Sequence, residues 1–277
     1  MQSQSAKGTA FRALHEQGEA FIIPNPWDVG TARLLAGLGF RALATTSAGY
    51  AFSAGKQDYR VGRDEMIAHV SAIASATELP VSADLENGYG DAPDTVAETI
   101  RLAAAAGIVG GSIEDSTNRP GDPIYELPIA AERLRAAAQA VRSLPFRFTL
   151  TGRAENYLWG RPDLRDTIRR LQAYQDAGAD VLYAPGLTSK EDIAAVVKAV
   201  DRPVNVVMGL QGVQLSRAEL SALGVKRISV GSALARAALG AFLRAAREML
   251  DRGTFTFANE AANYRDLNAM FEPTGNC

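Results

Sequence analysis

The sequence predicts a (β/α)8 barrel, in which parallel strands form a closed cylinder and a helix follows each strand. Short apolar runs alternate with helical patterns along the chain, and eight such runs occur in 277 residues. This alternation indicates parallel strands joined by crossover helices, and the length suits one barrel. An open doubly wound sheet is the alternative, but G-x-G-x-x-G and Walker A patterns are both missing from the sequence.

Each predicted element rests on a local pattern. The expected strands are FIIP at Phe21, RALATTS at Arg41, PVSAD at Pro80, GGSIED at Gly110, RFTLTGR at Arg147, DVLYAP at Asp180, PVNVVMG at Pro203 and RISVG at Arg227. An opening helix is expected over Ala10–Gln17, and the others begin near Asp28, Gly62, Ala92, Leu127, Arg161, Thr188, Ser216 and Ser232. Asp94 and Ser189 stand ahead of acidic first turns, which is typical of helix starts. No linker divides residues 1–277, so we expect a single domain.

The segment after the last strand has a different character. An Ala/Leu/Arg-rich helix is expected over Ala233–Asp251, and the segment ANEAANYRDLNAMF is also predicted to be helical. An apolar helix beyond the closed barrel has to pack on its own barrel or on a second subunit. We therefore expect residues 233–277 at a homo-oligomer interface.

Composition excludes several classes of function. The net charge is −2 and the basic residues are dispersed, so neither nucleic acid nor a membrane surface is an expected partner. Cys277 is the sole cysteine, which excludes an internal disulfide and a cysteine metal cluster. No signal-peptide run or membrane span is found, so we expect a cytoplasmic protein. His15 and His69 lie in helical patterns and are expected on the surface, which argues against histidine triads and zinc sites.

The stretch VSADLENGYG holds the first candidate site residues. Asp84 and Glu86 follow an apolar run, and residues i and i+2 of a strand point the same way. Glu114 ends the next predicted strand, and acids that converge favour a cation between them. Oxygen ligands suit Mg²⁺ or Mn²⁺, so we predict a divalent metal held by Asp84, with Glu86 and Glu114 as further ligands. There are two alternatives. Asp84 and Glu86 could be solvated acids in a loop, and Glu114 and Asp115 could cap the element that follows them.

Other candidates surround these acids at the predicted carboxyl ends of the strands. Arg153 is expected to bind a substrate carboxylate through its planar guanidinium, although an ion pair with Glu155 on the rim is an alternative. Ser47 and the small residues that follow it offer backbone N–H groups to an anion. Asn205 lies at the end of the seventh predicted strand and is a candidate substrate contact. Taken alone, Asp58 is an ordinary loop acid and Tyr50 a packing aromatic.

The sequence resembles the isocitrate lyase and phosphoenolpyruvate mutase superfamily over nearly its whole length. The resemblance is carried by NPWDVGTARLL, TTSAGYAFSAGKQD, SADLENGYGD, GGSIEDS, TGRAEN and RISVGSALARAA. It implies that Asp84 holds Mg²⁺ while Asp58, Glu86 and Glu114 act mainly through its water shell. It also implies that Ser47, Ala48 and Gly49 bind the carboxylate of an α-keto acid, that Arg153 grips the substrate, and that the eighth helix is exchanged between subunits of a dimer or tetramer.

Departures from the superfamily pattern narrow the expected reaction. The K-[KR]-C-G-H loop of isocitrate and methylisocitrate lyases is replaced by STNRPGDPIYELP, which has neither Cys nor His. The resemblance then suggests a Mg²⁺-dependent lyase that acts through an enolate, with decarboxylation of oxaloacetate as the simplest case. Cleavage of a 2-hydroxy acid with Tyr50 or a water as the acid–base group stays open, and so does C–P hydrolysis with Thr117 placing water. A catalytically weak α-keto-acid binding protein is the alternative from another class.

Overall fold

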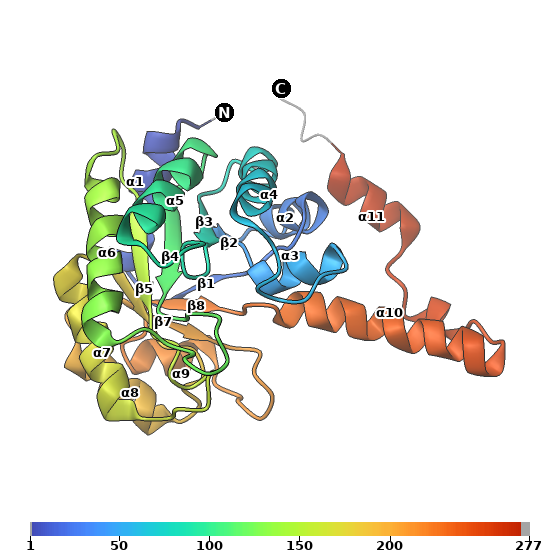
Figure 1. Ribbon diagram of the computed structural model, residues 1–277. Coiled ribbons are helices and arrows are strands. Elements are labelled where there is room, and N and C mark those ends of the chain that lie inside the picture. The colour runs from blue at the N-terminus through green and yellow to red at the C-terminus, as the bar shows by residue number, and fades with distance from the viewer. Residues whose placement is uncertain (1, 273–277) are drawn as a thin grey trace.

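Eight parallel strands form the centre of the computed structural model, which describes residues 2–272 (Figure 1). The strands are β1 (Phe21–Ile23), β2 (Leu43–Ala44), β3 (Val81–Asp84), β4 (Gly110–Glu114), β5 (Thr149–Arg153), β6 (Val181–Tyr183), β7 (Val204–Val207) and β8 (Arg227–Ser229). Each falls within one of the predicted apolar runs. Their order in the sheet is β1-β8-β7-β6-β5-β4-β3-β2, and every ladder is parallel.

The seam between β1 and β2 closes without a strand ladder. The Ala44 backbone N–H donates to the Pro24 carbonyl at 3.0 Å. The Asn25 side-chain amide donates to the Thr45 carbonyl at 2.9 Å, and its oxygen accepts from the N–H groups of Val230 and Gly231. Asn25 therefore ties the ends of β1, β2 and β8 together, and the predicted (β/α)8 barrel is confirmed.

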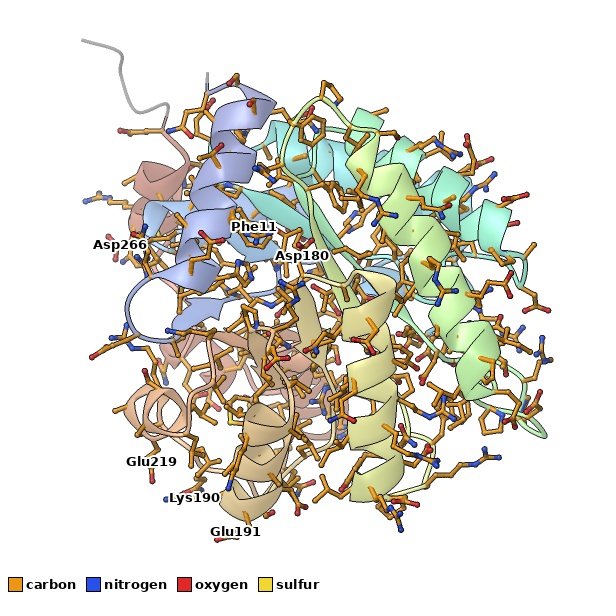
Figure 2. The ribbon with its side chains drawn as sticks, turned by 90° about the vertical axis from the view of Figure 1, so that its left-hand side faces the viewer. Phe11, Asp180, Lys190, Glu191, Glu219 and Asp266 are labelled. Atoms are coloured by element: carbon orange, nitrogen blue, oxygen red, sulfur yellow. The ribbon has the colours of Figure 1, made fainter. Side chains whose placement is uncertain are left out.

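Helices surround the strands. They are α1 (Gln4–Glu16), α2 (Val29–Gly37), α3 (Ser47–Ser53), α4 (Arg63–Ser75), α5 (Pro93–Ala105), α6 (Leu127–Arg142), α7 (Leu164–Ala177), α8 (Lys190–Ala199), α9 (Arg217–Ala222), α10 (Ala233–Arg252) and α11 (Tyr264–Phe271), with a 3₁₀ turn η1 at Thr256–Asn259. Most begin within two residues of the predicted start. Neighbouring helices are also linked at the surface: Lys190 on α8 pairs with Glu219 on α9 at 2.7 Å (Figure 2).

Four local predictions need correction. α1 begins at Gln4 rather than Ala10, because the Ser3 side chain caps it by accepting from the Ala6 N–H. α3 was not expected, since TTSAGYAFS reads as a strand end. α7 begins at Leu164 rather than Arg161, after Asp163 caps it. Asp94 lies inside the first turn of α5, whereas Ser189 caps α8 as expected.

An apolar plug closes the amino end of the barrel. Phe11 of α1 packs with Phe21 and Ile23 of β1, and all three side chains are buried. Gly110 at the start of β4 permits this contact, because a Cβ atom there would lie 2.8 Å from a Phe11 ring carbon. The open end of the barrel is therefore the carboxyl end, where sites in this fold are found.

Both histidines are buried, so the prediction that they lie on the surface was wrong. His15 on α1 sits edge-on between Phe11 and Phe21, and its Nδ1 lies 2.9 Å from the Phe11 carbonyl. His69 on α4 stacks on Tyr50 with 3.8 Å between the ring centroids. Burial is the main cause that lowers the pKa of His15 to about 3 and the pKa of His69 to about 4. Aromatic packing thus hides two polar side chains that helical periodicity alone assigns to solvent.

The C-terminal helices extend away from the barrel. α10 runs outward from β8, and α11 turns back towards α2 (Figure 1). Large apolar side chains along this segment are exposed, among them Phe242 at 67% and Leu250 at 85%, and Ala235 is the only buried residue of α10. None of the helices in residues 2–272 is both long and apolar enough to cross a membrane. Exchange of α10 between subunits stays a prediction, and residues 273–277 of the expected interface lie outside the described part of the chain.

Candidate active site

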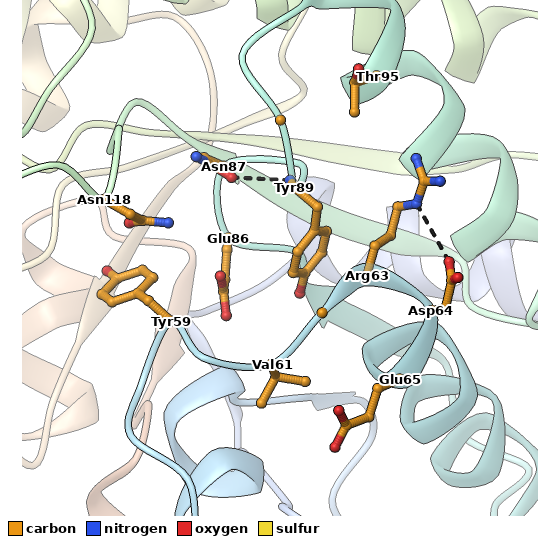
Figure 3. Close-up of a pocket in the computed structure, with 12 residues that line it drawn as sticks. Tyr59, Val61, Arg63, Asp64, Glu65, Glu86, Asn87, Tyr89, Thr95 and Asn118 are labelled. Carbon is orange, nitrogen blue, oxygen red and sulfur yellow. Dashed lines mark hydrogen bonds and ion pairs between the residues drawn. The ribbon is translucent and has the colours of Figure 1, made fainter.

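Two cavities meet the carboxyl ends of the strands. The first, of about 60 Å³, lies inside the barrel mouth and includes Asp84, Arg153, Asn205 and Arg227 in its lining. The second is a groove of about 740 Å³ between the loops that follow β2, β3 and β4 (Figure 3). Its walls include Tyr59, Arg63, Glu65, Glu86, Tyr89 and Asn118. Of the predicted site residues, Asp84, Arg153 and Asn205 line the interior chamber and Glu86 lines the open groove, and the others line neither cavity.

Asp84 stands at the end of β3 and is held by donors from the β2 side. Its Oδ2 accepts from both the backbone N–H of Ser47 at 3.1 Å and the Ser47 hydroxyl at 2.9 Å. The Asp84 N–H donates to the Thr45 hydroxyl oxygen at 2.9 Å. These contacts fix the carboxylate and leave Oδ1 directed towards the Arg153 side.

Arg153 lies among the acids rather than on the rim. Its Nη1 is 3.0 Å from Glu114 Oε2 and 3.5 Å from Asp84 Oδ1, and its Nε pairs with Glu155. The guanidinium also faces the Tyr183 ring at 5.3 Å from the centroid. The side chain is only 13% exposed, so the Glu155 pair is a buried contact and not the surface pair that was the alternative. A cation at this place can bridge the strand-end acids and a substrate carboxylate.

Glu86 and Asp58 join the acids through loop backbone rather than strand geometry. β3 ends at Asp84, and Glu86 follows with a positive φ of 48°, so the expected i, i+2 strand alignment does not apply. Burial, followed by the charges of Asp84 and Asp58, raises the pKa of Glu86 to about 8. Burial and the Asp84 charge also raise the pKa of Asp58. The loop after α3 therefore brings Asp58 close to Asp84 and Glu86.

Backbone strain is concentrated at the groove. Within residues 2–272, the non-glycine residues with positive φ are Tyr59, Glu86, Tyr89 and Asn118, and all four line the groove. Residues with a Cβ atom rarely adopt this left-handed conformation, and its cost is typical of functional sites. The Glu86 Oε1 and Tyr89 hydroxyl atoms are buried there without a hydrogen-bond partner in the structure. The groove thus presents polar atoms that are available to a ligand.

The acids outnumber the cations at the mouth. Burial is the leading cause that raises the pKa of Glu114 well above its usual value and that of Glu155 to about 7, despite Arg153. Glu114 Oε1 is buried without a partner, as is Glu86 Oε1. Such oxygen donors fit a hard divalent ion. No group of three or more His, Cys, Asp or Glu residues within residues 2–272 converges as a complete direct metal shell, so the arrangement fits few direct ligands with water between the ion and the other acids.

Some predicted residues are directed elsewhere. The Tyr50 hydroxyl lies 3.4 Å from Glu65 and its ring stacks on His69, and Tyr50 lines neither cavity. The Thr117 hydroxyl donates to the Asp122 carbonyl within its own loop. Ala48 and Gly49 lie in the first turn of α3, where the Gly49 N–H donates to the Thr46 hydroxyl oxygen at 3.2 Å. Substrate binding by Ser47, Ala48 and Gly49 stays a prediction.

Asp115 is a structural anchor rather than a cap for the following element. Its carboxylate accepts from Arg170 Nη1 at 3.0 Å, from the Tyr174 hydroxyl, and from the Glu155 N–H at 2.8 Å. The acid therefore joins the end of β4 to α7 and to the segment after β5. These bonds hold Glu155 in place beside Arg153.

Sequence reasoning missed several polar residues near the acids. Tyr183 ends β6 and Arg227 begins β8, and both line the interior cavity together with Asn205. Asn205 accepts from Arg227 Nε at 2.9 Å and donates to Ser229 at 3.0 Å. The sequence did contain a signal for Arg227. Side chains alternate along a strand, so Arg227 and Ser229 point to the same side of β8, into the barrel, and Ile228 points outward to the helices. Tyr59 and Tyr89 carried no such signal, because their orientation depends on left-handed loop conformations.

The fold and the acids around Arg153 place the protein in the class of (β/α)8 barrels whose strand ends carry a cluster of carboxylates. Comparison with known families is consistent with this class: the profile named Phosphoenolpyruvate phosphomutase matches residues 11–250. The chain belongs to this family, and the resemblance seen in the sequence is confirmed.

Two curated proteins are similar in sequence over most of this chain. An uncharacterized protein of Mycobacterium tuberculosis is 35% identical over 87% of this chain and 89% of its own length. An oxaloacetate decarboxylase of Chromohalobacter salexigens is 28% identical over 87% of this chain and 84% of its own.

Two solved structures show the same fold. A Burkholderia cenocepacia protein provisionally assigned as a lyase/mutase is 66% identical, with a TM-score of 0.96 and 98% of each chain covered. A 2,3-dimethylmalate lyase, a member of the PEP mutase/isocitrate lyase superfamily, is 27% identical with a TM-score of 0.85, over 98% of this chain and 95% of its own. The named relatives include a decarboxylase and a lyase, whereas the family profile is named for a mutase.

Proposed function

We propose that this protein is a divalent-metal-dependent carbon–carbon lyase that acts on a small α-keto or 2-hydroxy di- or tricarboxylic acid through an enolate. Decarboxylation of oxaloacetate is the first candidate reaction. The observation that carries the proposal is the position of Arg153, whose guanidinium contacts Asp84, Glu114 and Glu155 at the open end of the barrel. Relatives named as oxaloacetate decarboxylase and 2,3-dimethylmalate lyase support the reaction class.

The charge balance explains why a metal belongs to the proposal. Asp58, Asp84, Glu86, Glu114 and Glu155 lie around Arg153, as the effects of their charges on one another's pKa values indicate. A carboxylate substrate would be repelled by this surplus of negative charge. Mg²⁺ or Mn²⁺ held by Asp84, with Asp58, Glu86 and Glu114 around its waters, would reverse that balance. When bound, the ion would stabilise negative charge on the enolate oxygen.

The chain's own residues would bind and orient the acid. Arg153 can present its planar guanidinium to a substrate carboxylate while its other edge stays paired with Glu155. Ser47 holds Asp84 in one orientation through two hydrogen bonds to one oxygen. Tyr59 and Tyr89 line the groove next to Glu86 and would restrict water around the reacting carbons (Figure 3).

A second candidate is an α-keto-acid binding protein with little or no turnover. It is favoured by the absence of a cysteine from the β4–α6 loop and by the Thr117 hydroxyl, which is taken by a carbonyl of that same loop. The Tyr50 hydroxyl also faces Glu65 rather than the mouth. These contacts direct the Thr117 hydroxyl away from placing water for C–P hydrolysis and the Tyr50 hydroxyl away from acid–base work in 2-hydroxy-acid cleavage. A water stays the other acid–base group proposed for the second reaction.

Turnover separates the two candidates. The full-length protein would be assayed with oxaloacetate, methylisocitrate and phosphonopyruvate, with Mg²⁺ and with EDTA, while pyruvate and 2-oxoglutarate binding is measured by thermal shift. Metal-dependent release of CO₂ or of a second acid supports the lyase. Binding of keto acids without conversion of any candidate would favour the binding protein instead.

We also propose that the protein works as a homo-oligomer in the cytoplasm, with α10 as its main contact. Phe242, Leu243 and Leu250 leave a long apolar surface on a helix that hardly touches its own barrel. Extended apolar patches of this kind are typical of subunit interfaces. A second copy of the chain would cover this surface and bring the end of α10 against the neighbouring barrel.

A further inference from the structure

Arg227 is a buried cation in the barrel interior, and within residues 2–272 it forms no ion pair with an acidic side chain. Its Nε donates to the Asn205 amide oxygen at 2.9 Å, and its Nη2 donates to the Thr151 hydroxyl at 3.0 Å, so both partners are neutral. Its Nη1 is buried and has no hydrogen-bond partner in the part of the chain that the structure describes. A buried charge is costly unless it is paired, so this nitrogen calls for an anion or for ordered water.

The cavity that Arg227 lines also contacts the proposed catalytic residues at the carboxyl ends of the strands. Asp84 and Arg153 line the same chamber of about 60 Å³. Its remaining polar walls are hydroxyl and amide side chains, from Asn25, Thr45, Ser82, Ser112, Tyr183, Asn205 and Ser229. Asp84 is the only carboxylate in this lining, whereas the outer groove includes Asp64, Glu65 and Glu86. The interior chamber is therefore the part of the site that favours an anion.

The size of the chamber limits what it can take. A water molecule occupies about 30 Å³ of liquid, so the chamber has room for about two waters or for one carboxylate group. A group much larger than a carboxylate would not fit beside Arg227 while the rest of the molecule contacts Asp84 and Arg153. The chamber thus suits the end of a short acid that enters from the mouth.

We infer that Arg227 and the chamber above it form an anion subsite that binds a second carboxylate of the substrate, which makes the substrate a short-chain dicarboxylate. This inference rests on the proposed function and narrows it, because a keto acid with only one carboxylate would leave the chamber without an anion, and the chamber has room for no more than one carboxylate group beside Arg227. Arg153 takes one carboxylate at the mouth, and Arg227 takes the other on the floor.

Binding measurements on the full-length protein with Mg²⁺ test the inference. Malonate serves as the dicarboxylate probe and acetate as the monocarboxylate probe, in titrations of the wild type, Arg227→Gln, Arg227→Lys and the surface control Arg135→Gln. We expect Arg227→Gln to weaken malonate at least tenfold and acetate less than threefold, Arg227→Lys to lie between, and the control to match the wild type. Equal changes for both probes, or none, would overturn the subsite.

Crystals of the wild type provide a readout that needs no variant, since a buried arginine is sensitive to substitution. With malonate, we expect a carboxylate oxygen within hydrogen-bond distance of Arg227 Nη1, and water alone at that nitrogen would contradict the inference. A bromide soak and competition with chloride distinguish a substrate carboxylate from a free inorganic anion as the occupant of the chamber. Malonate binding that is retained at high chloride supports the carboxylate. Loss of malonate binding would assign the chamber to a halide.

The outcomes for this subsite and for the proposed function stay distinct. If the wild type converts oxaloacetate but malonate affinity is unchanged by Arg227→Gln, the subsite proposal is wrong and the lyase proposal is supported. If malonate occupies the chamber while no acid is converted, the lyase fails and the subsite stands. Circular dichroism and melting curves accompany each variant, so that a loss of folding is not counted as a loss of binding.

Discussion

Ser47 donates its backbone N–H and its hydroxyl to the same oxygen of Asp84, at 3.1 and 2.9 Å. The sequence suggested that Ser47 binds the substrate carboxylate, but in the structure both donors stabilise the acid proposed to hold the metal. Thr46 caps α3 and so fixes the turn that presents Ser47 to β3. The unexpected helix α3 therefore has a direct role in orienting the candidate metal ligand.

Ser47→Ala should weaken Mg²⁺ binding without unfolding the protein. A hydrogen bond to a charged group contributes about 1.5–3 kcal/mol, so the metal dissociation constant should rise about tenfold or more. Calorimetric titration of Mg²⁺ measures it. Ser53→Ala is the matched control, because its hydroxyl bonds only the Tyr50 carbonyl within the same helix. Unchanged Mg²⁺ affinity in Ser47→Ala would return Ser47 to the substrate.

Arg153→Ala should weaken binding of a carboxylate ligand by about 2–4 kcal/mol, because the lost partner is a buried, paired cation. The variant also removes the positive charge that lowers the pKa of Glu114 and of Glu155 against the effect of burial. Pyruvate or oxalate titrations measure the effect, and Arg165→Ala on the exposed side of α7 is the control. Near-normal affinity would limit Arg153 to a structural role.

Asp84→Ala should abolish Mg²⁺ binding while the barrel stays folded. Asp84 lies at the end of its strand, where its side chain contributes to the site rather than to the apolar core. Melting curves with and without Mg²⁺ report both properties at once, because a bound ligand raises the melting temperature of the folded state. A Mg²⁺-induced shift equal to that of the wild type would show that another acid carries the ion. Asp180→Ala, at the opposite end of the barrel, serves as the comparison.

His69 should make the protein less stable in acid. Its pKa in the folded state is lowered to about 4 by burial, whereas the unfolded chain protonates near 6.5. The unfolded state therefore binds more protons below that value, and stability falls as pH drops from 6.5 towards 4, by at most about 1.4 kcal/mol per pH unit. Denaturant unfolding of the wild type and of His69→Phe isolates this contribution. Their difference should be constant above pH 7 and change in acid, and a pH-independent difference would refute it.

Phe242→Glu should dissociate the proposed oligomer. The side chain is two-thirds exposed on α10, so a charge there costs little in an isolated chain but is unfavourable within an apolar interface. Light scattering coupled to size exclusion measures the mass. Ile129→Glu, a comparable exposed apolar position on α6, is the control. A wild type that runs as a monomer, or a variant of unchanged mass, would contradict the role of α10.

The sequence was sufficient for the strands and for the residues at their carboxyl ends. Buried parallel strands appear as continuous apolar runs, and parallel topology places their ends at one edge. The sequence alone therefore groups Asp84, Glu114 and Arg153 at one end of the barrel. Their mutual contacts follow directly from the β3–β4–β5 register, which pairs Glu114 with Arg153.

Loop conformations and the burial of polar side chains could not be predicted from the sequence. Tyr59 and Glu86 adopt a left-handed backbone conformation. Glycine usually marks such a position in a sequence, and neither of these residues is a glycine. His15 and His69 are buried by aromatic neighbours that lie on other elements or at a distance along the chain. Strand parity places Arg227 inside the barrel, but its neutral partners, Asn205 on the adjacent β7 and Thr151 on β5, are known only from the fold.

The Asn25 tie between β1 and β2 has a consequence for how the barrel breathes. Because side-chain and isolated backbone bonds replace a ladder there, Ala44 should exchange its amide proton with solvent sooner than the central strands do. That weak line ends next to Ser47 and the mouth of the barrel. Local opening of the seam would therefore loosen the turn that orients Ser47 while the central strands stay paired.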